Sequence, residues 1–450
     1  MQRVHFIAIG GAAMHNLAIA LKEKGYQVTG SDDEIFEPSR SRLEKQNILP
    51  QEFGWFPHKI NASIDTIILG MHARPDNPEL LKAKELGLNI VSYPEFLYQQ
   101  TSNKKRIVVA GSHGKTTTTA MILHVLKHLN FKFDYMVGSH IDGFENMVGL
   151  SHDAQIAIFE GDEYLSSPID RRSKFLWYKP DIAILTGIEW DHINVFPTME
   201  SYIDTFKQFI ETISSTGKLF WYKNDIEIQK LIETTKIKGS QYQYEGLEWT
   251  KESNGSIVTY NNQKFESKLF GDHNFQNLNA ALQVCIELGI EPVQFFESMQ
   301  NFKGADRRLQ LIKEGSNPIF YDFAHAPSKV RATVAAVRKL YPDKKIVACY
   351  ELHTFSSLNT EFLTHYNATL DNADTAYIYF NPEVIKHKNM EALDPNFVHQ
   401  CFQHKNSTVI TDNDTLFKNV EKAWKEGSVI LLMSSGNFGG VDPTKWADKL

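Results

Sequence analysis

The feature that most constrains the fold is an alternation of short apolar segments with helical segments along the 450-residue chain. Apolar runs such as Val4–Ile9, Arg106–Ala110 and Ile319–Asp322 are each followed by a turn and then by a segment with helical periodicity. Strands that alternate with helices form parallel sheets covered by helices on both faces. We therefore predict an α/β protein built from three successive series of strands and helices.

Two irregular stretches divide these series. Residues 101–105 are short, polar and unpatterned, which is typical of a linker, and the third series begins near Gln310. Residues 241–270 alternate and are rich in Tyr, Thr and Ser, which indicates a small antiparallel sheet. We expect three domains: a Rossmann-like domain over 1–101, a central P-loop domain with a parallel sheet and the antiparallel addition over 106–303, and a Rossmann-like domain over 304–450.

Composition bears on partners and location. The net charge of −7 and the pI near 6.2 give no basic footprint, so we expect no nucleic-acid partner. No apolar run approaches the length of a membrane span, and the first residues lead into a strand rather than a secretion signal. The 3 cysteines are far apart, which favours a reducing compartment. We expect a cytoplasmic protein. These features do not specify its oligomeric state, a monomer or a weak dimer.

The loop Gly111-Ser112-His113-Gly114-Lys115-Thr116 directly follows a β-branched strand and precedes a helix predicted over Thr117–Leu129. Glycines let backbone N–H groups approach an anion, and the helix N-terminus adds about half a positive charge. Lys115 would reach the outer phosphates of ATP, and the Thr116 hydroxyl would ligate Mg²⁺. Val109 stands where the general motif has glycine, so this is a shorter form of the phosphate loop.

Two further polar groups follow strands of the same series. Glu160 comes directly after Ile156–Phe159, and His192 lies shortly after Ile182–Thr186. The carboxyl ends of parallel strands meet at the ligand-binding edge of a sheet. We therefore predict Glu160 as a magnesium ligand near the phosphates, with His192 as a second candidate ligand.

The first turn of the chain, Ala8–Met14, departs from the dinucleotide-binding pattern Gly-x-Gly-x-x-Gly at Ala8 and Ala13. Asp32 lies 22 positions after Gly10, a spacing that suits a ribose contact. These residues alone leave NAD and a different nucleotide as alternative ligands of the first domain.

Several separated motifs together resemble the Mur ligase family, the ATP-dependent muramyl ligases of bacterial cell-wall synthesis. They are the loop at 111–116, the pattern His-Asn-x-x-Asn-x-x-Ala-Ala at 273–281, the pair Arg307-Arg308, and the pattern Asp-x-x-His-x-Pro at 322–327. The resemblance implies that an Asn of the second motif contacts adenine, that Arg308 reaches the terminal phosphate and that Asp322 contacts ATP. The implied ATP contacts are Gly111, Ser112, His113, Gly114, Lys115, Thr116, Thr117, Asn274, Asn277, Arg308 and Asp322.

The resemblance also implies a UDP-sugar in the first domain and an amine acceptor partly held by the third. The implied UDP-sugar contacts are Gly10, Gly11, Met14, Asp32, His72 and Asn77. The implied catalytic residues are Lys115, Glu160, His192 and Arg308, with Mg²⁺ held by Thr116, Glu160 and His192. Lys207 stands 15 residues beyond His192, where some family members carry a carbamylated lysine, but we expect an ordinary exposed lysine on a helix over Ser201–Ile213.

Three stretches bear on the acceptor. Residues 163–164, 170–175 and 433–440 resemble the branch that adds L-alanyl-γ-D-glutamyl-meso-diaminopimelate to UDP-N-acetylmuramate in peptidoglycan recycling. The alternative within the family is the branch that adds L-alanine. His353 stands where the tripeptide branch has arginine, and imidazole lacks the bidentate fork of guanidinium. The expected acceptor contacts are His325, His353, Ser434 and Gly436.

Overall fold

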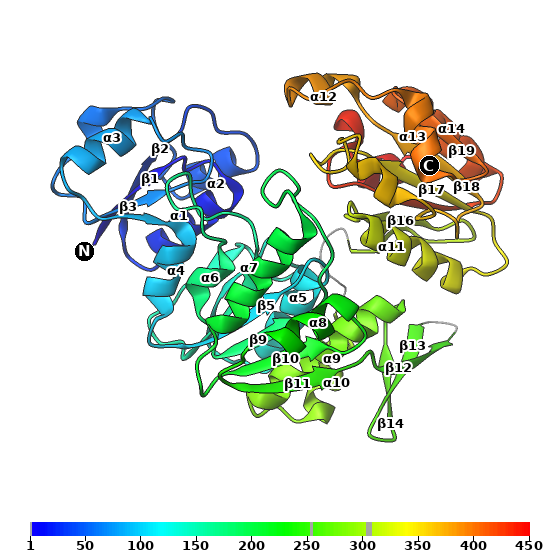
Figure 1. Cartoon of the computed structure of the whole chain (residues 1–450), viewed down its shortest axis with the longest axis horizontal. Helices are drawn as coiled ribbons and strands as arrows, with labels where there is room; N and C mark the ends of the chain where they lie inside the picture. Colours follow the sequence, from blue (N-terminus) through cyan, green and yellow to red (C-terminus); the bar gives the residue numbers. More distant parts are fainter. Residues whose placement is uncertain (1, 253–254, 303–307) are drawn as a thin grey trace. The chain divides into compact units, whose positions relative to one another are not determined.

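The computed structural model describes residues 2–252, 255–302 and 308–450 (Figure 1). Its internal contacts divide it into two compact units. Unit 1 comprises Met1–Ile188, Glu200–Glu245 and Asn279–Phe302, and unit 2 comprises Glu189–Met199, Gly246–Leu278 and Lys303–Leu450. The expected boundary at 303/304 falls on residues outside the described part of the chain.

Unit 1 begins with a four-stranded parallel sheet in the order β2-β1-β3-β4. Gly25, with φ 93°, follows the first helix and lets the chain turn into the second strand. The Asn77 and Ser92 side chains cap two further helices by accepting hydrogen bonds from backbone N–H groups. The elements are β1 (Arg3–Ile7), α1 (Ala12–Glu23), β2 (Gln27–Ser31), α2 (Ser39–Lys45), η1 (Pro57–Lys59), β3 (Thr66–Leu69), α3 (Pro78–Glu85), β4 (Ile90–Ser92) and α4 (Tyr93–Thr101).

The second sheet of unit 1 has seven strands in the order β11-β10-β9-β5-β8-β6-β7, and only the edge strand β7 is antiparallel. Its central strands are apolar at their fully buried positions because helices cover both faces. The strands are β5 (Lys105–Ala110), β6 (Phe133–Met136), β7 (Val148–Gly149), β8 (Ile156–Gly161), β9 (Ile182–Leu185), β10 (Lys218–Tyr222) and β11 (Ser240–Tyr244). The helices include α5 (Lys115–His128), α6 (Phe175–Tyr178), α7 (Met199–Glu211), α8 (Ile226–Thr234) and α10 (Pro292–Met299).

The segment predicted as antiparallel is only partly so. Residues 240–244 form β11, which pairs in parallel with β10 at the edge of the seven-stranded sheet. The antiparallel sheet follows it, as β12 (Glu248–Glu252), β13 (Gly255–Tyr260) and β14 (Gln263–Ser267), and belongs to unit 2 by its contacts. The helix α9 (Asp272–Glu287) follows this sheet.

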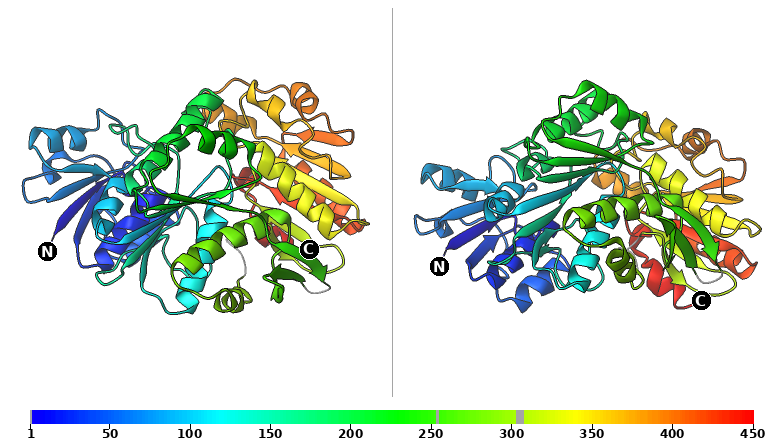
Figure 2. Two further views of the ribbon diagram at one scale, coloured as in Figure 1. Left: turned by 60° about the horizontal axis from the view of Figure 1, so that its bottom comes forward. Right: turned by 90° about the horizontal axis from the view of Figure 1, so that it is seen from below.

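The main sheet of unit 2 has six strands in the order β15-β16-β20-β17-β18-β19, parallel except for β15. Side chains alternate along β17: Ala348 and Tyr350 pack on one face, and Val347 and Cys349 pack on the other. Helices cover both faces (Figure 2). The elements are β15 (Gln310–Lys313), β16 (Ile319–Asp322), α11 (Pro327–Leu340), β17 (Ile346–Glu351), η2 (Phe362–Tyr366), β18 (Thr375–Tyr379), α12 (Pro382–His387), α13 (Pro395–Phe402), β19 (Ser407–Ile410), α14 (Asn413–Lys425), β20 (Val429–Met433), η3 (Phe438–Gly440) and α15 (Pro443–Ala447).

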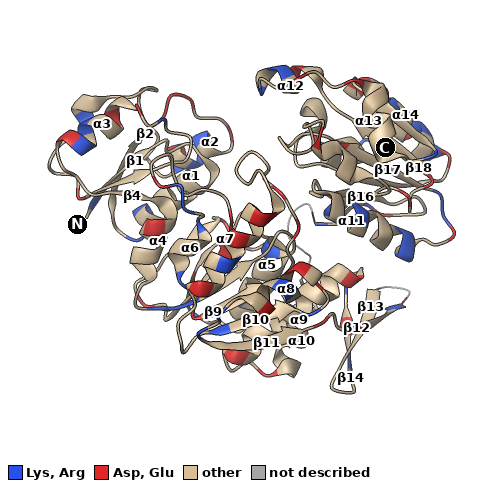
Figure 3. Ribbon diagram, viewed as in Figure 1, with Lys and Arg blue, Asp and Glu red and all other residues tan. Residues whose placement is uncertain are grey.

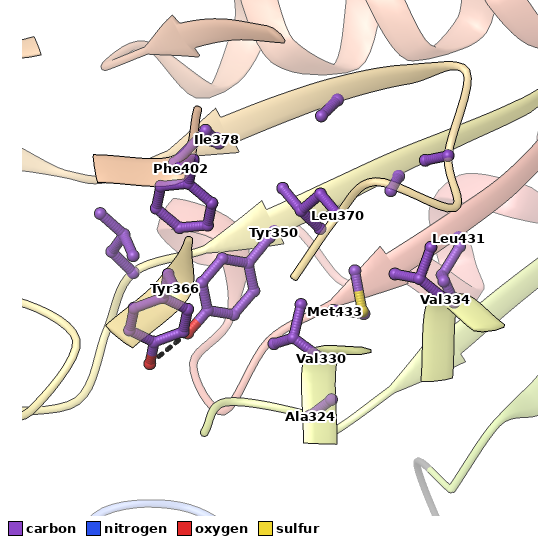
Figure 4. Packing of buried hydrophobic residues seen from close by; sticks show 14 of the residues in the cluster. Ala324, Val330, Val334, Tyr350, Tyr366, Leu370, Ile378, Phe402, Leu431 and Met433 are labelled. Carbon is purple, nitrogen blue, oxygen red and sulfur yellow. Dashed lines mark hydrogen bonds between the residues drawn. The ribbon is translucent and has the colours of Figure 1, made fainter. Parts of the chain in front are cut away.

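An aromatic group fills one face of this sheet (Figure 4). The hydroxyl groups of Tyr350 and Tyr366 lie 2.9 Å apart, and the Tyr366 ring stacks on Phe402 with ring centres 5.2 Å apart. Both tyrosine hydroxyls also donate to the carbonyl oxygen of His325, at 2.7 and 2.5 Å. The core of unit 2 therefore fixes the backbone of one predicted acceptor residue.

No helix in the described part of the chain is both long and apolar enough to cross a membrane. Acidic and basic positions are interspersed along the elements of each unit (Figure 3). A phosphate or carboxylate ligand would therefore be held by a few local donors rather than by a broad basic surface.

Candidate active site

The phosphate-type loop joins β5 to α5 in unit 1. Gly111 has φ 134°, and a β-carbon there would lie 2.2 Å from the hydroxyl oxygen of Thr186, so only glycine fits. Gly114 precedes the helix with φ 76°, in the left-handed region that favours glycine. The helix therefore begins at Lys115, two residues earlier than predicted, and its first N–H groups are oriented as an anion site requires.

Lys115 lies over this loop. Its ammonium group donates to the carbonyl oxygen of Gly111 at 2.5 Å and pairs with the Glu163 carboxylate at 2.9 Å. Burial lowers the pKa of Lys115, but the carboxylates of Glu163, Asp162 and Glu160 raise it, and the net pKa is above the usual value. Lys115 therefore stays charged at neutral pH and can neutralise phosphate oxygens.

The rest of the loop is tied to the neighbouring strand and helix. The Ser112 hydroxyl lies 2.8 Å from that of Tyr202, which in turn donates to Glu163 at 2.8 Å. His113 is half-buried, and Thr117 is buried in the first turn of the helix. Glu163 was not among the predicted site residues. The sequence feature that could have indicated it is its position three residues after Glu160, at the end of the same strand.

The structure brings two of the predicted magnesium ligands together. The Thr116 hydroxyl donates to Glu160 Oε1 at 2.8 Å, and the backbone N–H of Gly138 donates to Glu160 Oε2 at 2.8 Å. A β-carbon at Gly138 would lie 2.8 Å from Glu160 Oε1, so the carboxylate is packed against this glycine. A hydroxyl and a carboxylate are hard oxygen donors, which suit Mg²⁺ that keeps water and phosphate as its other ligands.

His192 belongs to unit 2, whereas Thr116 and Glu160 belong to unit 1. It has φ 56°, and its backbone N–H donates to the Asp191 carboxylate at 2.7 Å. Within the described ranges, no cluster of three or more His, Cys, Asp or Glu side chains has the arrangement of a metal site. Lys207 is exposed on α7.

The first sheet of unit 1 carries the predicted UDP-sugar residues at its carboxyl edge. The Asp32 carboxylate accepts from the backbone N–H of Gly10 at 2.7 Å and from that of Asp33 at 3.0 Å. Burial raises the pKa of Asp32 to about 6. Asp32 thus braces the first turn, a role that its spacing from Gly10 did not indicate. His72 is exposed just after β3, and Asn77 is buried as the cap of α3.

A buried polar group on α1 links this turn to the seven-stranded sheet, within unit 1. His15 Nδ1 lies 2.9 Å from the carbonyl oxygen of Gly11, and Asn16 Oδ1 accepts from the backbone N–H of Met147 at 2.9 Å. Arg42 donates to Asn146 Oδ1 at 2.6 Å. The sequence signal was the pair His15-Asn16 inside the otherwise apolar run that begins at Met14, itself buried.

This link continues to the Glu160 carboxylate. The backbone N–H of Val137 donates to the carbonyl oxygen of Met147 at 3.0 Å, and the next residue, Gly138, donates to Glu160. A chain of hydrogen bonds therefore runs from the first turn through Asn16 and Met147 to the candidate metal ligand.

Unit 2 holds the predicted adenine and terminal-phosphate residues. Asn274 donates to the carbonyl oxygen of Phe270 at 2.7 Å, and Asn277 is buried on the same helix. The Asp322 carboxylate accepts from the backbone N–H groups of Leu309 at 2.5 Å and Ala324 at 2.6 Å. The Arg308 guanidinium lies 4.9 Å from the centre of the Phe323 ring, whereas Arg307 lies outside the described residues.

His325 pairs with a carboxylate that sequence reasoning missed. Its Nε2 lies 3.5 Å from the Asp191 carboxylate, which also lies 3.9 Å from the Lys329 ammonium. Burial raises the pKa of Asp191, but the neighbouring His192, His325 and Lys329 lower it, and the net pKa is well below its usual range. Burial lowers the pKa of His325. Asp191 is therefore a fixed negative charge beside the predicted acceptor residue.

The other predicted acceptor residues gather around Glu351, at the carboxyl ends of β17 and β20. The hydroxyl of Ser434 and the backbone N–H of Phe438, the latter at 2.9 Å, donate to Glu351 Oε2. His353 Nδ1 lies 3.8 Å from Glu351 Oε1. A β-carbon at Gly436 would lie 2.5 Å from His353 Nδ1, so only glycine fits beside this imidazole. Burial raises the pKa of Glu351.

Known proteins resemble the chain along nearly its whole length. Residues 3–105 match the Mur ligase family catalytic domain, residues 109–285 match the Mur ligase middle domain, and residues 307–436 match the Mur ligase glutamate ligase domain. A UDP-N-acetylmuramate–L-alanine ligase of Lactiplantibacillus plantarum is 32% identical over 383 residues, covering 83% of each chain.

A second relative has a different acceptor in its name. The UDP-N-acetylmuramate–L-alanyl-γ-D-glutamyl-meso-2,6-diaminoheptandioate ligase of Escherichia coli is 28% identical over 450 residues, covering 98% of this chain and 96% of that protein. In fold, the chain is similar to a murein peptide ligase from Psychrobacter arcticus, with a TM-score of 0.69, 22% identity and coverage of 100% and 99%.

Proposed function

Because the chain belongs to the Mur ligase family, whose members are ATP-dependent acid–amino-acid ligases of peptidoglycan synthesis, we propose that its acceptor is the tripeptide L-alanyl-γ-D-glutamyl-meso-diaminopimelate. The acid is then UDP-N-acetylmuramate, and the reaction belongs to peptidoglycan recycling. The motifs at 163–164, 170–175 and 433–440 support this choice, as does the match to the Escherichia coli tripeptide ligase over 98% of this chain. The L-alanine ligase of similar identity makes L-alanine the alternative acceptor.

The proposed reaction activates a carboxylate, which by itself is a poor acyl donor. The lactyl carboxylate attacks the γ-phosphorus of ATP, and the bond from that phosphorus to the bridging oxygen breaks, which releases ADP. The acceptor amine then attacks the acyl carbon, loses a proton, and displaces inorganic phosphate. Phosphoryl transfer of this kind depends on positioning and on charge neutralisation rather than on a protein nucleophile.

The residues of the candidate active site have specific roles in the proposed reaction. Lys115 would neutralise the transferred phosphoryl group from the loop, and the family resemblance gives Arg308 a role at the same phosphate. Thr116 and Glu160 would hold Mg²⁺, with His192 as a further candidate, and the bound ion would neutralise charge on the phosphate oxygens. The observation that carries the proposal is the cluster of Lys115, Thr116 and Glu160 at the carboxyl ends of adjacent parallel strands.

The first domain is proposed to bind the UDP-sugar rather than NAD. Both Asp32 oxygens accept backbone N–H bonds, so this carboxylate braces the turn and is already engaged at the position of a ribose contact. A thermal-shift comparison of the two ligands tests this point. UDP-N-acetylmuramate should raise the melting temperature, whereas selective stabilisation by NAD would contradict the assignment.

The acceptor can be tested by incubating the enzyme with ATP, Mg²⁺ and UDP-N-acetylmuramate and offering either the tripeptide or L-alanine. Mass spectrometry should detect the UDP-N-acetylmuramyl-tripeptide, with one phosphate released for each product molecule. A Lys115→Ala variant with an unchanged melting temperature should form none. Turnover of L-alanine with no tripeptide product would replace the proposed acceptor with the alternative.

A further inference from the structure

A cation that the proposed chemistry does not use lies against the loop that carries His353. Lys388 is the residue that caps α12, and its ammonium group lies 4.3 Å from the centre of the Phe355 ring. Phe355 and His353 belong to the loop that leaves β17, and α12 follows β18. Because β17 and β18 are parallel neighbours, this loop and this helix leave the sheet at the same edge.

Lys388 lacks a counter-ion within the described part of the chain. It is half-buried, and among the residues that the structure describes none forms an ion pair or a hydrogen bond with its ammonium group. Burial lowers its pKa. A cation that is partly removed from water without an anion is costly, and an anionic ligand would offset that cost.

The neighbouring imidazole does not supply a charge of its own. Burial is the main cause that lowers the pKa of His353, and the charge of Lys388 lowers it further, so the ring is neutral at neutral pH. The Glu351 carboxylate lies 3.8 Å from His353 Nδ1 and accepts hydrogen bonds from Ser434 and Phe438. Lys388 is therefore the fixed positive charge in this group, at an edge where the tripeptide branch has an arginine in place of His353.

We propose that Lys388 binds a carboxylate of the acceptor peptide. This inference rests on the proposed function, since the tripeptide carries carboxylates on its diaminopimelate residue that L-alanine lacks. The ammonium group lies on the Phe355 ring, which is 43% exposed, so a ligand can reach this edge from solvent. Its role is to bind and orient the acceptor, and it takes no part in phosphoryl transfer.

The test measures phosphate release at increasing tripeptide concentration for the full-length enzyme and three variants. Lys388→Met should raise the KM for the tripeptide about 10-fold, the loss expected for one charge-assisted hydrogen bond, with kcat changed less than about twofold. Lys388→Arg should restore most of this loss. Lys386→Met, at an exposed lysine on the same helix, is the matched control and should behave as wild type. The KM values for ATP and UDP-N-acetylmuramate should not change in any variant.

A second acceptor makes the test specific to the carboxylate. A tripeptide with amidated diaminopimelate carboxylates should have a raised KM with wild-type enzyme and no further increase with Lys388→Met. An unchanged tripeptide KM in Lys388→Met, or an equal loss with the amidated peptide, would overturn the inference alone. A wild-type enzyme that uses L-alanine but not the tripeptide would overturn the proposed function and this inference with it.

Discussion

The hydrogen bonds of Asn16 give a prediction about how the two sheets of unit 1 are held together. Asn16 is fully buried; its Nδ2 donates to the carbonyl oxygen of Ala12 at 2.8 Å and lies 3.0 Å from His15 Nε2, and its Oδ1 accepts from Met147. Asn16→Ala removes these bonds and leaves the Met147 N–H and the His15 ring without this partner. A lost bond plus an unsatisfied buried group costs roughly 2–3 kcal/mol.

This loss of stability can be measured as a lowered melting temperature. For a unit of this size, a loss of about 2–3 kcal/mol lowers the melting temperature by about 4–12 °C. The matched control is Asn89→Ala, because Asn89 lies in the same unit and makes an exposed hydrogen bond to Thr66. The control should change the stability by less than about 0.5 kcal/mol.

The Asn16→Ala variant also tests the link between the proposed UDP-sugar site and the Glu160 carboxylate. Since Met147 is connected through Val137 and Gly138 to Glu160, Asn16→Ala should also raise the KM for UDP-N-acetylmuramate and lower kcat, measured by phosphate release below the melting transition. If Asn16→Ala melts within about 1 °C of Asn89→Ala, the reasoning about this buried link is wrong. If kcat is nevertheless lowered in that case, the link to Glu160 stands and only the stability argument fails.

Three further predictions concern single positions. Gly138→Ala should lower kcat at least about 10-fold at nearly unchanged stability, because the new methyl group would lie 2.8 Å from Glu160 Oε1. A Gly138→Ala variant that keeps the wild-type kcat would show that this carboxylate is not needed for turnover. Gly436→Ala should raise the KM for the acceptor but not the KM for ATP, because its β-carbon would lie 2.5 Å from His353 Nδ1. A parallel rise in both KM values would show that the substitution disrupts the fold as a whole instead of the acceptor site. The pKa of Asp32 is raised to about 6 in the folded chain, so its contribution to stability is present below its unfolded pKa near 4 and is lost as the pH rises through about 6. The melting temperature of Asp32→Asn relative to wild type should therefore rise between pH 4 and pH 7, and a flat or falling difference would contradict the assignment.

The strand, loop and helix around residues 111–116 could be predicted because their determinants are contiguous. A β-branched strand, two glycines, a lysine and a helix lie within a single short stretch, and only the helix start at Lys115 was misplaced. The carboxyl-edge positions of Glu160 and of Ser434 likewise follow from the parallel strands that precede them. Local pattern and the topology of parallel sheets are enough for such residues.

Other contacts depend on the order of the strands, which the sequence pattern does not specify. Asn16 and Met147 are 131 residues apart and meet because α1 packs against β7 in unit 1. Lys388 approaches Phe355 because β18 lies beside β17, although a whole strand and its connection separate them in sequence. Asp32 has the spacing of a ligand contact, yet its carboxylate turns back onto the Gly10 amide. For the same reason the strand over 240–244 was assigned to the wrong sheet.

The central claim is that an acyl-phosphate forms between the acid and ATP, and one isotope measurement tests it directly. UDP-N-acetylmuramate with a lactyl carboxylate enriched in oxygen-18 is incubated with the enzyme, ATP, Mg²⁺ and the tripeptide, and the released phosphate is analysed by mass spectrometry. Attack of the carboxylate on the γ-phosphorus predicts that each phosphate carries one labelled oxygen from the acid. Released phosphate without the label, alongside a correctly formed amide, would contradict the proposed mechanism.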